Sequence, residues 1–181
     1  MSDNKQSGMT ILELTITLVV VAMVMLFASL AMLEALKISQ LRGATRKVLA
    51  EIRHTRSLAL SDVGTFGLHW GGDTGAPGKD YFRVEENTGT ACSWPPVGDV
   101  VTSNANVITD WFDLSDEYTG ITIASIEDNN NQILGGIAFN SRGGSDNPCT
   151  VVAYPVTITI SSPSGATRTI EIQGAGVARM S

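Results

Sequence analysis

The sequence contains few cysteines, histidines and aromatic residues, and these shortages argue against several classes of site. Among 181 residues there are two cysteines, Cys92 and Cys149, and two histidines, His54 and His69. Neither pair has the spacing of a zinc-binding or redox motif, so no metal site is expected. The sequence also lacks a phosphate-binding loop, a Gly-x-Ser-x-Gly elbow and a Cys/His nucleophile pattern. We therefore expect no catalytic residues, no cofactor and no enzymatic activity.

Positive charge is scarce over most of the chain. Residues 62–181 hold 14 acidic and five basic side chains, a net charge of −9, whereas the whole chain carries −6. Residues 34–61 are the exception, with six basic and two acidic side chains. An acidic domain repels phosphate backbones, so a nucleic-acid partner is not expected.

The longest apolar stretch indicates a membrane anchor. Residues 14–33 contain no charge, proline or glycine, and as a helix they would rise roughly 30 Å, enough to cross a bilayer core. No Ala-x-Ala-like cleavage site follows this stretch, so the sequence predicts an anchor that is retained rather than removed. The predicted organisation is a polar leader at 1–8, a transmembrane helix at 9–33, its amphipathic continuation at 34–61 and a globular domain at 62–181.

The amphipathic continuation shows the apolar spacing of a helix that covers a core, with charges between the apolar positions. A single helix over residues 9–61 is therefore predicted, ending where Ser61-Asp62-Val63-Gly64 favours a stop. After Gly64 the pattern is that of β-strands separated by turns, which gives an α+β fold with an antiparallel, β-rich domain. The predicted strands are Thr65–Trp70, Tyr81–Glu85, Asp110–Leu114, Ile121–Ile126, Ile133–Phe139, Val151–Ile160 and Thr167–Ile172, with the last two joined as a hairpin and residues 86–108 left as an irregular excursion.

Glu13 is a carboxylate at the start of an apolar helix. Burial of a lone acid in a membrane costs several kcal/mol, so such acids usually have a partner and a role. The alternative is a glutamate that lies at the membrane interface and merely reaches toward water. The side-chain chemistry alone does not separate these two interpretations.

The run Gly8-Met9-Thr10-Ile11-Leu12-Glu13-Leu14 resembles the type III signal of type IV pilins and type II secretion pseudopilins. The resemblance implies that prepilin peptidase cuts between Gly8 and Met9 and methylates the new amine of Met9. It also implies that Glu13 acts in subunit assembly by neutralising a neighbour's amine. The anchor would then lie in the inner membrane, with the C-terminal domain in the periplasm.

Three later segments resemble the minor pilins of the GspH/FimT type. They are Arg53–Ser61, Ile137–Gly143 and Gly174–Arg179. This resemblance implies a structural minor pilin or pseudopilin that helps to assemble or cap a type II secretion pseudopilus or a type IV pilus. Its partners would be other pilin subunits, the prepilin peptidase and the inner membrane.

Two other functions stay open. One is a minor pilin that binds DNA for natural transformation, which a basic patch near Arg168 and Arg179 would favour; the stretch Gly176-Val177-Ala178-Arg179 has one arginine fewer than the Gly-Arg-x-Arg motif of such pilins. The other is a single-pass anchored periplasmic enzyme or binding module. The run 128–131 resembles part of a calcium loop but lacks its glycine and distal glutamate, which favours a solvated turn.

In an oxidising compartment Cys92 and Cys149 can form a disulfide; the alternative is two separate buried thiols. A bridge would close a loop of 57 residues (149 minus 92), worth roughly 4 kcal/mol in the chain-entropy model. We expect peptide mapping of oxidised protein without reductant to find the two cysteines in one linked peptide pair. Free alkylation of both thiols in the oxidised protein would contradict this prediction.

Overall fold

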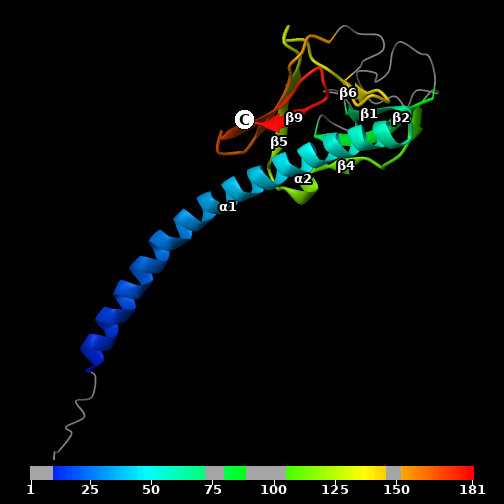
Figure 1. Ribbon diagram of the computed structural model, residues 1–181. Coiled ribbons are helices and arrows are strands. Elements are labelled where there is room, and N and C mark those ends of the chain that lie inside the picture. The colour runs from blue at the N-terminus through cyan, green and yellow to red at the C-terminus, as the bar shows by residue number, and fades with distance from the viewer. Residues whose placement is uncertain (1–9, 72–79, 89–104, 146–151) are drawn as a thin grey trace, which may run out of the picture. The chain divides into compact units, whose positions relative to one another are not determined.

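The structure is a computed structural model that describes residues 10–71, 80–88, 105–145 and 152–181. The chain divides into two compact units, residues 1–37 and 38–181. The first is helical in its described part. The second contains the C-terminal part of the same helix and two antiparallel sheets (Figure 1). The predicted α+β class is confirmed.

The long helix α1 runs from Ile11 to Ser61, so the predicted single helix is confirmed over its described length. Within the second unit its buried apolar positions recur every three or four residues, which places them on one face. These positions are Leu41, Ala44, Val48, Leu49, Ile52 and Ala59. Two buried threonines share this face, and their hydroxyls donate to carbonyls one turn earlier: Thr45 to Leu41 at 2.6 Å and Thr55 to Glu51 at 2.8 Å. These hydrogen bonds allow polar side chains in the core without an unsatisfied donor.

The end of α1 lies where the sequence predicted a stop. The backbone N–H of Asp62 and the hydroxyl of Ser61 both donate to the carbonyl of Leu58, at 2.9 and 3.1 Å. The chain then turns through Val63, whose φ is 53°. A β-branched residue in this left-handed region is strained by about 1–2 kcal/mol. The turn brings the chain from the helix directly into the first strand.

The first sheet, sheet A, contains five antiparallel strands in the order β3-β2-β1-β6, with β4 paired to β2 beside β3. Its strands are β1 Thr65–Trp70, β2 Tyr81–Asn87, β3 Ala105–Val107, β4 Phe112–Asp113 and β6 Gly136–Phe139. The central strand β1 is buried on both faces from Phe66 to Trp70. One face contributes Phe66, Leu68 and Trp70 to the core, and the other carries polar side chains.

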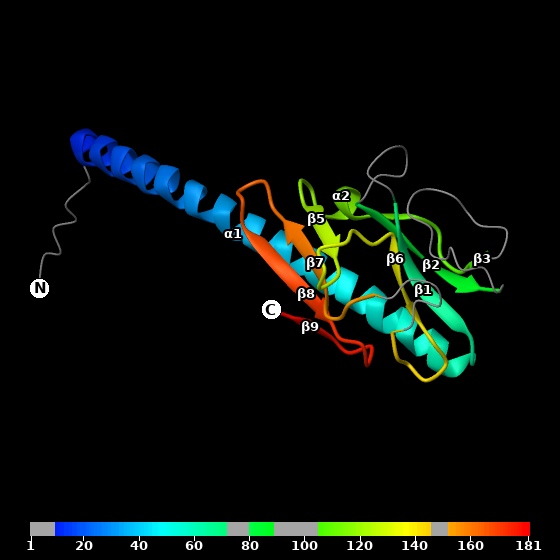
Figure 2. The same cartoon turned by 90° about the horizontal axis from the view of Figure 1, so that it is seen from above.

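The second sheet, sheet B, has four antiparallel strands in the order β5-β7-β8-β9 (Figure 2). Its strands are β5 Thr122–Glu127, β7 Val156–Ser161, β8 Thr167–Ile172 and β9 Ala178–Met180. Burial alternates along β7, as in a sheet with one face in the core and one face toward solvent. The predicted hairpin is confirmed, since Ser161 pairs with Thr167 and the register continues to Val156 opposite Ile172.

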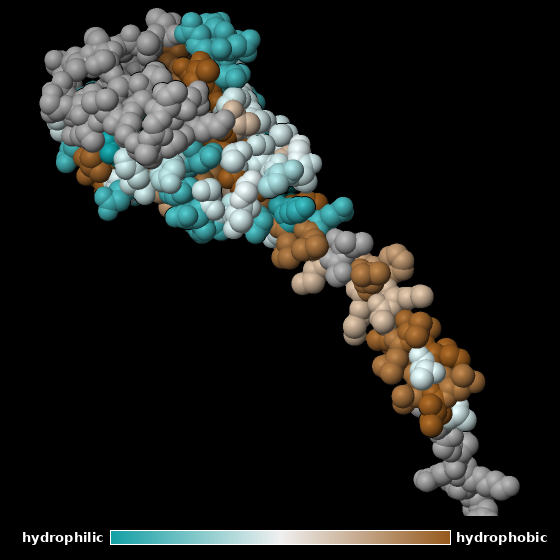
Figure 3. All heavy atoms as spheres, turned by 180° about the vertical axis from the view of Figure 1, so that it is seen from behind, coloured by the Kyte–Doolittle hydropathy of each residue, from teal (hydrophilic) through white to brown (hydrophobic). Residues whose placement is uncertain are grey.

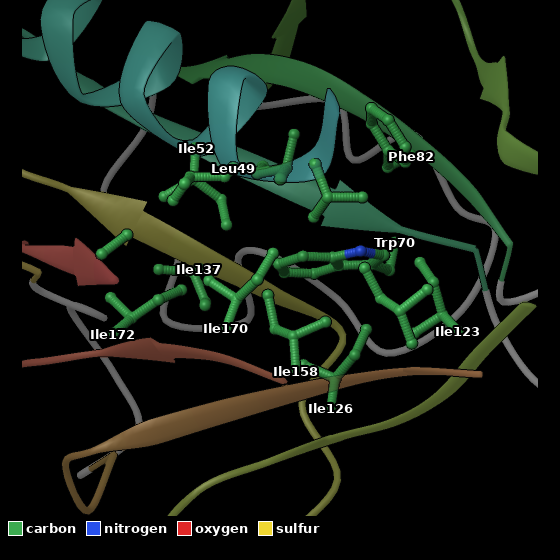
Figure 4. Close-up of a cluster of buried hydrophobic side chains, with 14 of the residues drawn as sticks. Leu49, Ile52, Trp70, Phe82, Ile123, Ile126, Ile137, Ile158, Ile170 and Ile172 are labelled. Atoms are coloured by element: carbon green, nitrogen blue, oxygen red, sulfur yellow. The ribbon is translucent and has the colours of Figure 1, made fainter. Parts of the chain in front are cut away.

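A single hydrophobic core joins α1 to both sheets. Figure 4 shows Leu49 and Ile52 of the helix above Trp70 of sheet A and a group of isoleucines, with Phe82 of sheet A to one side. Sheet B supplies most of that group, with Ile123, Ile126, Ile158, Ile170 and Ile172. Burial of each such side chain is worth about 1.5–3 kcal/mol, so the shared core is the main source of stability in this unit.

Two predicted strands are wrong in part because local hydrogen bonds compete with strand pairing. The predicted strand Asp110–Leu114 contains only the two-residue β4, after which the short helix α2 (Leu114–Glu117) begins. Asp113 caps α2 by accepting from the backbone N–H of Ser115 at 2.8 Å, and an aspartate in this position starts a helix. In the predicted strand Val151–Ile160, β7 begins only at Val156, because Ala153 instead exchanges hydrogen bonds with the loop at 128–129.

Other differences concern strands that are short. The predicted strand Ile133–Phe139 starts at Gly136, and Ile133 forms only an isolated bridge to Glu127. Part of the predicted excursion 86–108 is strand, since β2 extends to Asn87 and pairs there with β3. The three-residue β9 was not predicted. Strands this short show too few alternations for a sequence pattern to reveal them.

Arg56 of α1 joins the turns that follow β6 and β8. Its Nε donates to the carbonyl of Gly143 at 2.8 Å, and its Nη2 donates to the carbonyl of Ala175 at 3.3 Å. The two turns also contact each other, because the N–H of Ser145 donates to the carbonyl of Gly174 at 3.1 Å. One helical side chain therefore connects sheet A to sheet B.

We expect Gly176→Ala to weaken this junction severely. Gly176 has φ of 75°, and a Cβ there would lie 2.1 Å from the carbonyl oxygen of Gly143. Left-handed strain and the forced displacement of the turn together predict a loss of about 2–5 kcal/mol in the free energy of unfolding. The measurement is urea unfolding of the full chain in detergent.

Gly165→Ala is the matched control. Gly165 has φ of 80°, but a Cβ there meets nothing within 4 Å. It should cost only the left-handed strain, about 1–2 kcal/mol. Equal losses in the two variants would show that the junction at Gly176 is not closely packed.

Candidate assembly site and buried polar centre

The candidate assembly site lies at the start of α1. The carbonyl of Thr10 accepts from the N–H of Leu14 at 3.1 Å, and its hydroxyl oxygen accepts from the N–H of Glu13 at 3.3 Å. Thr10 is therefore the N-cap, and Glu13 is the third residue of the first turn. Unpaired N–H groups at a helix start are a favourable neighbour for an acidic side chain.

The cap was missed by the sequence analysis, although a signal for it was present. A threonine followed three residues later by a glutamate, just before an apolar run, is the pattern of a capping box. Thr10 and Glu13 have that spacing. The same glutamate can thus take part in helix initiation and remain available to a partner.

The helical segment around Glu13 exposes apolar side chains in every direction. Ile11 is 85% exposed and Phe27 is 71% exposed, and Figure 3 shows the apolar side chains on the visible face of this segment. By length and composition α1 can cross a bilayer, and within the described residues it is the one helix with that property. Such a surface requires lipid or apolar protein around it.

The other polar groups early in this segment are satisfied internally. The hydroxyls of Thr15 and Thr17 donate to the carbonyls of Leu12 and Leu14, both at 2.8 Å. For the carboxylate of Glu13, the described part of the chain provides neither an ion pair nor a hydrogen bond. It is thus the group in this apolar segment that still requires a partner. Gly8, Met9, Cys92 and Cys149 lie outside the described residues.

A buried polar centre occupies the outer face of sheet A. It consists of His69 on β1, Arg83 and Glu85 on β2, and Trp111. The Arg83 guanidinium bonds to one carboxylate oxygen of Glu85, and Nδ1 of His69 lies 3.4 Å from the same oxygen. The Trp111 ring covers the group, with its centroid 4.2 Å from Cζ of Arg83 and 5.5 Å from the His69 ring.

Charge balance explains how this centre is tolerated. Burial by itself would raise the pKa of Glu85, but the hydrogen bonds and charges of His69 and Arg83 outweigh it and hold the pKa below its ordinary value. The carboxylate and the guanidinium thus remain an ion pair inside the protein. Among the described residues, His, Cys, Asp and Glu side chains nowhere gather in a group of three that could hold a metal ion.

Comparison with known proteins gives a motif for the N-terminal segment and a fold for the chain. Residues 3–29 match the family described as the prokaryotic N-terminal methylation motif. The structure is similar to the type IV minor pilin FimU of Pseudomonas aeruginosa, with a TM-score of 0.51 and 14% identity over 79% of this chain and 89% of FimU. The chain has a type IV pilin-like fold.

Two further solved structures are similar to this chain. A second crystal form of FimU has a TM-score of 0.50 and 15% identity, covering 78% of this chain and 92% of that one. The minor pseudopilin EpsH of the type 2 secretion system of Vibrio cholerae has a TM-score of 0.47 and 12% identity, covering 78% and 96%. No curated protein sequence gives a significant match. The methylation motif spans Gly8, Met9 and Glu13, whose individual roles stay predictions.

The two weaker alternatives left by the sequence, a basic patch for DNA and a calcium loop, gain no support from the pilin-like unit. Arg168 and Arg179 lie on opposite faces of sheet B. Arg179 pairs with Glu171 and shares its face. Arg168, which pairs with Ile160, lies three residues before Glu171 on β8 and therefore points to the other face. They therefore form no common basic patch. This arrangement gives DNA binding no support.

The loop at Asp128 is a capped turn. Its carboxylate accepts from the N–H groups of Asn130 at 2.8 Å, Gln132 at 2.9 Å and Ala153 at 3.2 Å. These bonds, led by that from Gln132, lower the pKa of Asp128. The prediction of a solvated turn is right for the exposed Asn129, but it is wrong for Asp128, which is buried. Its oxygens already accept three backbone N–H groups, as in other aspartate-capped loops.

We expect Glu85→Gln to destabilise the pilin-like unit by about 3–5 kcal/mol near pH 7, because it leaves the buried Arg83 charge without a counter-charge. The folded-state pKa of Glu85 is below its ordinary value of 4.5. The ion pair therefore stabilises the protein above that pH, and its contribution is lost as the pH falls through the lowered pKa. The difference between wild type and Glu85→Gln should thus shrink in acid.

Urea unfolding at pH 7, 5 and 3 measures this difference. Glu86→Gln is the control, since Glu86 is adjacent on β2 but only half-buried. It should change stability by less than about 1 kcal/mol at every pH. A Glu85→Gln deficit that stayed constant down to pH 3 would contradict the assigned direction of the pKa shift.

Proposed function

We propose that this chain is a minor pilin or pseudopilin that is incorporated into a type IV pilus or a type II secretion pseudopilus and takes part in its assembly or capping. Prepilin peptidase cuts it between Gly8 and Met9 and methylates the Met9 amine. Residues 9–33 anchor it in the inner membrane, and the globular unit lies in the periplasm. In this proposal the chain is the substrate of an enzyme and a structural subunit.

The observation that carries the proposal is the position of Glu13 within a chain of pilin-like fold. The carboxylate lies in the first turn of a helix whose neighbouring side chains are apolar and exposed. It lies inside the segment that matches the methylation motif, and it has no partner among the described residues. A plain membrane anchor does not require an acid at this position.

The chemistry of cleavage provides the missing partner. Cutting after Gly8 creates a positive amine at Met9, four residues before Glu13 in sequence. In a bundle of such helices, the amine of one subunit and the carboxylate of a neighbour neutralise each other in an environment of low dielectric. Because both charges are confined to helix starts, the pairing also sets the axial register between neighbours.

We expect the mature protein to begin at a methylated Met9. Intact-mass measurement of the protein purified from a host with active prepilin peptidase should give the mass of residues 9–181 plus one methyl group. A Gly8→Leu variant should retain the leader, because a large side chain replaces glycine in the peptidase subsite. Retention of residues 1–8 by the wild-type protein in that host would contradict the proposal.

We expect Glu13→Leu to be cleaved, inserted in the membrane and folded, yet poorly incorporated. The substitution leaves a neighbour's amine without its counter-charge, a loss of about 3–5 kcal/mol. That corresponds to a decrease in incorporation of about a hundred-fold or more. The measurement is the amount of the chain that co-purifies with filament subunits, together with a secretion or piliation readout.

Glu34→Leu is the matched control. It removes an acid from the same helix by the same substitution, but from a position after the apolar run. We expect it to be incorporated like wild type. If Glu13→Leu and Glu34→Leu were both incorporated normally, Glu13 would have no role in assembly.

A further inference from the structure

One flank of α1 in the globular unit presents three exposed arginines. Arg42, Arg46 and Arg53 have exposed side chains, and among the described residues none has an ion-pair or hydrogen-bond partner. At about 100° per residue, their positions fall within about 40° of one another around the helix axis. They therefore form one stripe, which we call the basic flank.

The other flank of α1 lies beside the segment that contains α2. A Cβ on Gly43 would lie 2.6 Å from Cε1 of Tyr118, and Nζ of Lys47 lies 4.6 Å from the centroid of the Phe112 ring. Around the helix axis, the midpoint between Gly43 and Lys47 lies about 100° from the midpoint of the basic flank. Figure 1 shows α2 and β4 next to α1. The basic flank therefore points away from α2.

Exposed carboxylates are concentrated in the α2 segment. Asp110, Asp116 and Glu117 are exposed, and we call them the acidic flank. Asp113 lies among them but is engaged as the N-cap of α2. A hydrogen bond to Asp113, followed by the charge of Asp113 and then those of Asp116 and Asp80, raises the pKa of Tyr81, as expected where several carboxylates lie close together.

The two flanks lie on different sides of α1, so they do not contact each other within one chain. We propose that the basic flank of one chain docks on the acidic flank of a second copy of this chain. A contact between two different surfaces of identical subunits leaves one flank of each kind free at the ends, so it can repeat along a filament or close into a ring. The inference rests on the proposed function, since it names a neighbour for a filament subunit.

Anionic lipid headgroups are the other chemistry that would attract arginines. A headgroup layer is about 5–8 Å deep on each side of the bilayer core. From Arg42 to Arg53 the basic flank extends about 16 Å along the helix. This length exceeds the depth of one headgroup layer, and a protein surface fits the basic flank better.

The test uses two differently tagged copies of the full chain, co-expressed in the membrane and captured through one tag. One variant reverses the basic flank with Arg42→Glu, Arg46→Glu and Arg53→Glu. The other reverses the acidic flank with Asp110→Lys, Asp116→Lys and Glu117→Lys. We expect each variant to capture its own kind at least tenfold less than wild type does, because like charges then face each other. Wild-type capture should also weaken with added salt.

The most informative experiment combines the variant whose basic flank is reversed with the variant whose acidic flank is reversed. When the two variants are co-expressed, opposite charges again meet at every contact, so capture should return to near the wild-type level. The charge-preserving control Arg42→Lys, Arg46→Lys, Arg53→Lys should retain capture, and thermal melting should show that each variant is folded. Undiminished self-capture by the reversed basic flank, or no recovery in the mixed pair, would overturn the inference.

Two further outcomes would also overturn it. If the arginine reversal abolished binding to phosphatidylglycerol vesicles but left capture intact, the basic flank would serve lipid. If wild-type chains did not capture each other while Glu13→Leu still abolished incorporation into filaments, the second copy would be the wrong neighbour and the proposed function would stand. Loss of the Glu13 effect alone would instead contradict the proposed function.

Discussion

The globular unit depends on one constraint: neither sheet can bury its apolar face without α1. Sheet B has a single inner face of isoleucines, and sheet A offers mainly aromatic and aliphatic side chains. The helix face that includes Val48 and Ile52 completes the core for both. Arg56 then connects the turns after β6 and β8 through two backbone carbonyls. Because those turns belong to different sheets, this side chain and the direct hydrogen bond from Ser145 to Gly174 together hold the sheets to each other.

The outer face of sheet A shows the cost of burying a sheet on both sides. A sheet covered on one face would have Arg83 and Glu85 in water, where each is well solvated. Here both are buried, so each requires the other, and His69 and Trp111 complete their surroundings. Removing one partner is more damaging than replacing the whole group by apolar residues, since it leaves an uncompensated charge. The centre therefore makes the arrangement of this face specific.

Glu13 follows the same rule in an apolar segment: a carboxylate in apolar surroundings requires a partner. In the globular unit the counter-charge of a buried carboxylate comes from a neighbouring position on the same strand. In the apolar segment at the start of α1, threonine hydroxyls are satisfied within the helix but the Glu13 carboxylate is not. The proposed pairing of Glu13 with the Met9 amine of a neighbouring subunit would satisfy its carboxylate by the same rule that organises the core.

The sequence by itself determined those features that depend on local spacing. The uncharged run at 14–33, the helix end at Ser61 and the hairpin from Val156 to Ile172 follow from periodicity and turn residues, and the structure has all three. The resemblance of the run Gly8–Leu14 to a pilin signal also depends on neighbouring residues alone, and residues 3–29 match the methylation motif. Even the cap at Thr10 was readable from four consecutive residues. These features need only neighbours in the chain.

Only the tertiary structure decided which distant segments meet. In the sequence, the segments Arg53–Ser61, Ile137–Gly143 and Gly174–Arg179 are far apart. In the structure, Arg56 brings them together through the carbonyls of Gly143 and Ala175. His69 and Glu85 likewise read as parts of ordinary strands, and their burial depends on the register between β1 and β2. Asp113 ended a predicted strand because a local cap competed with pairing. Pairing between distant strands and burial on a second face are set by the packing of the whole unit, which no local pattern encodes.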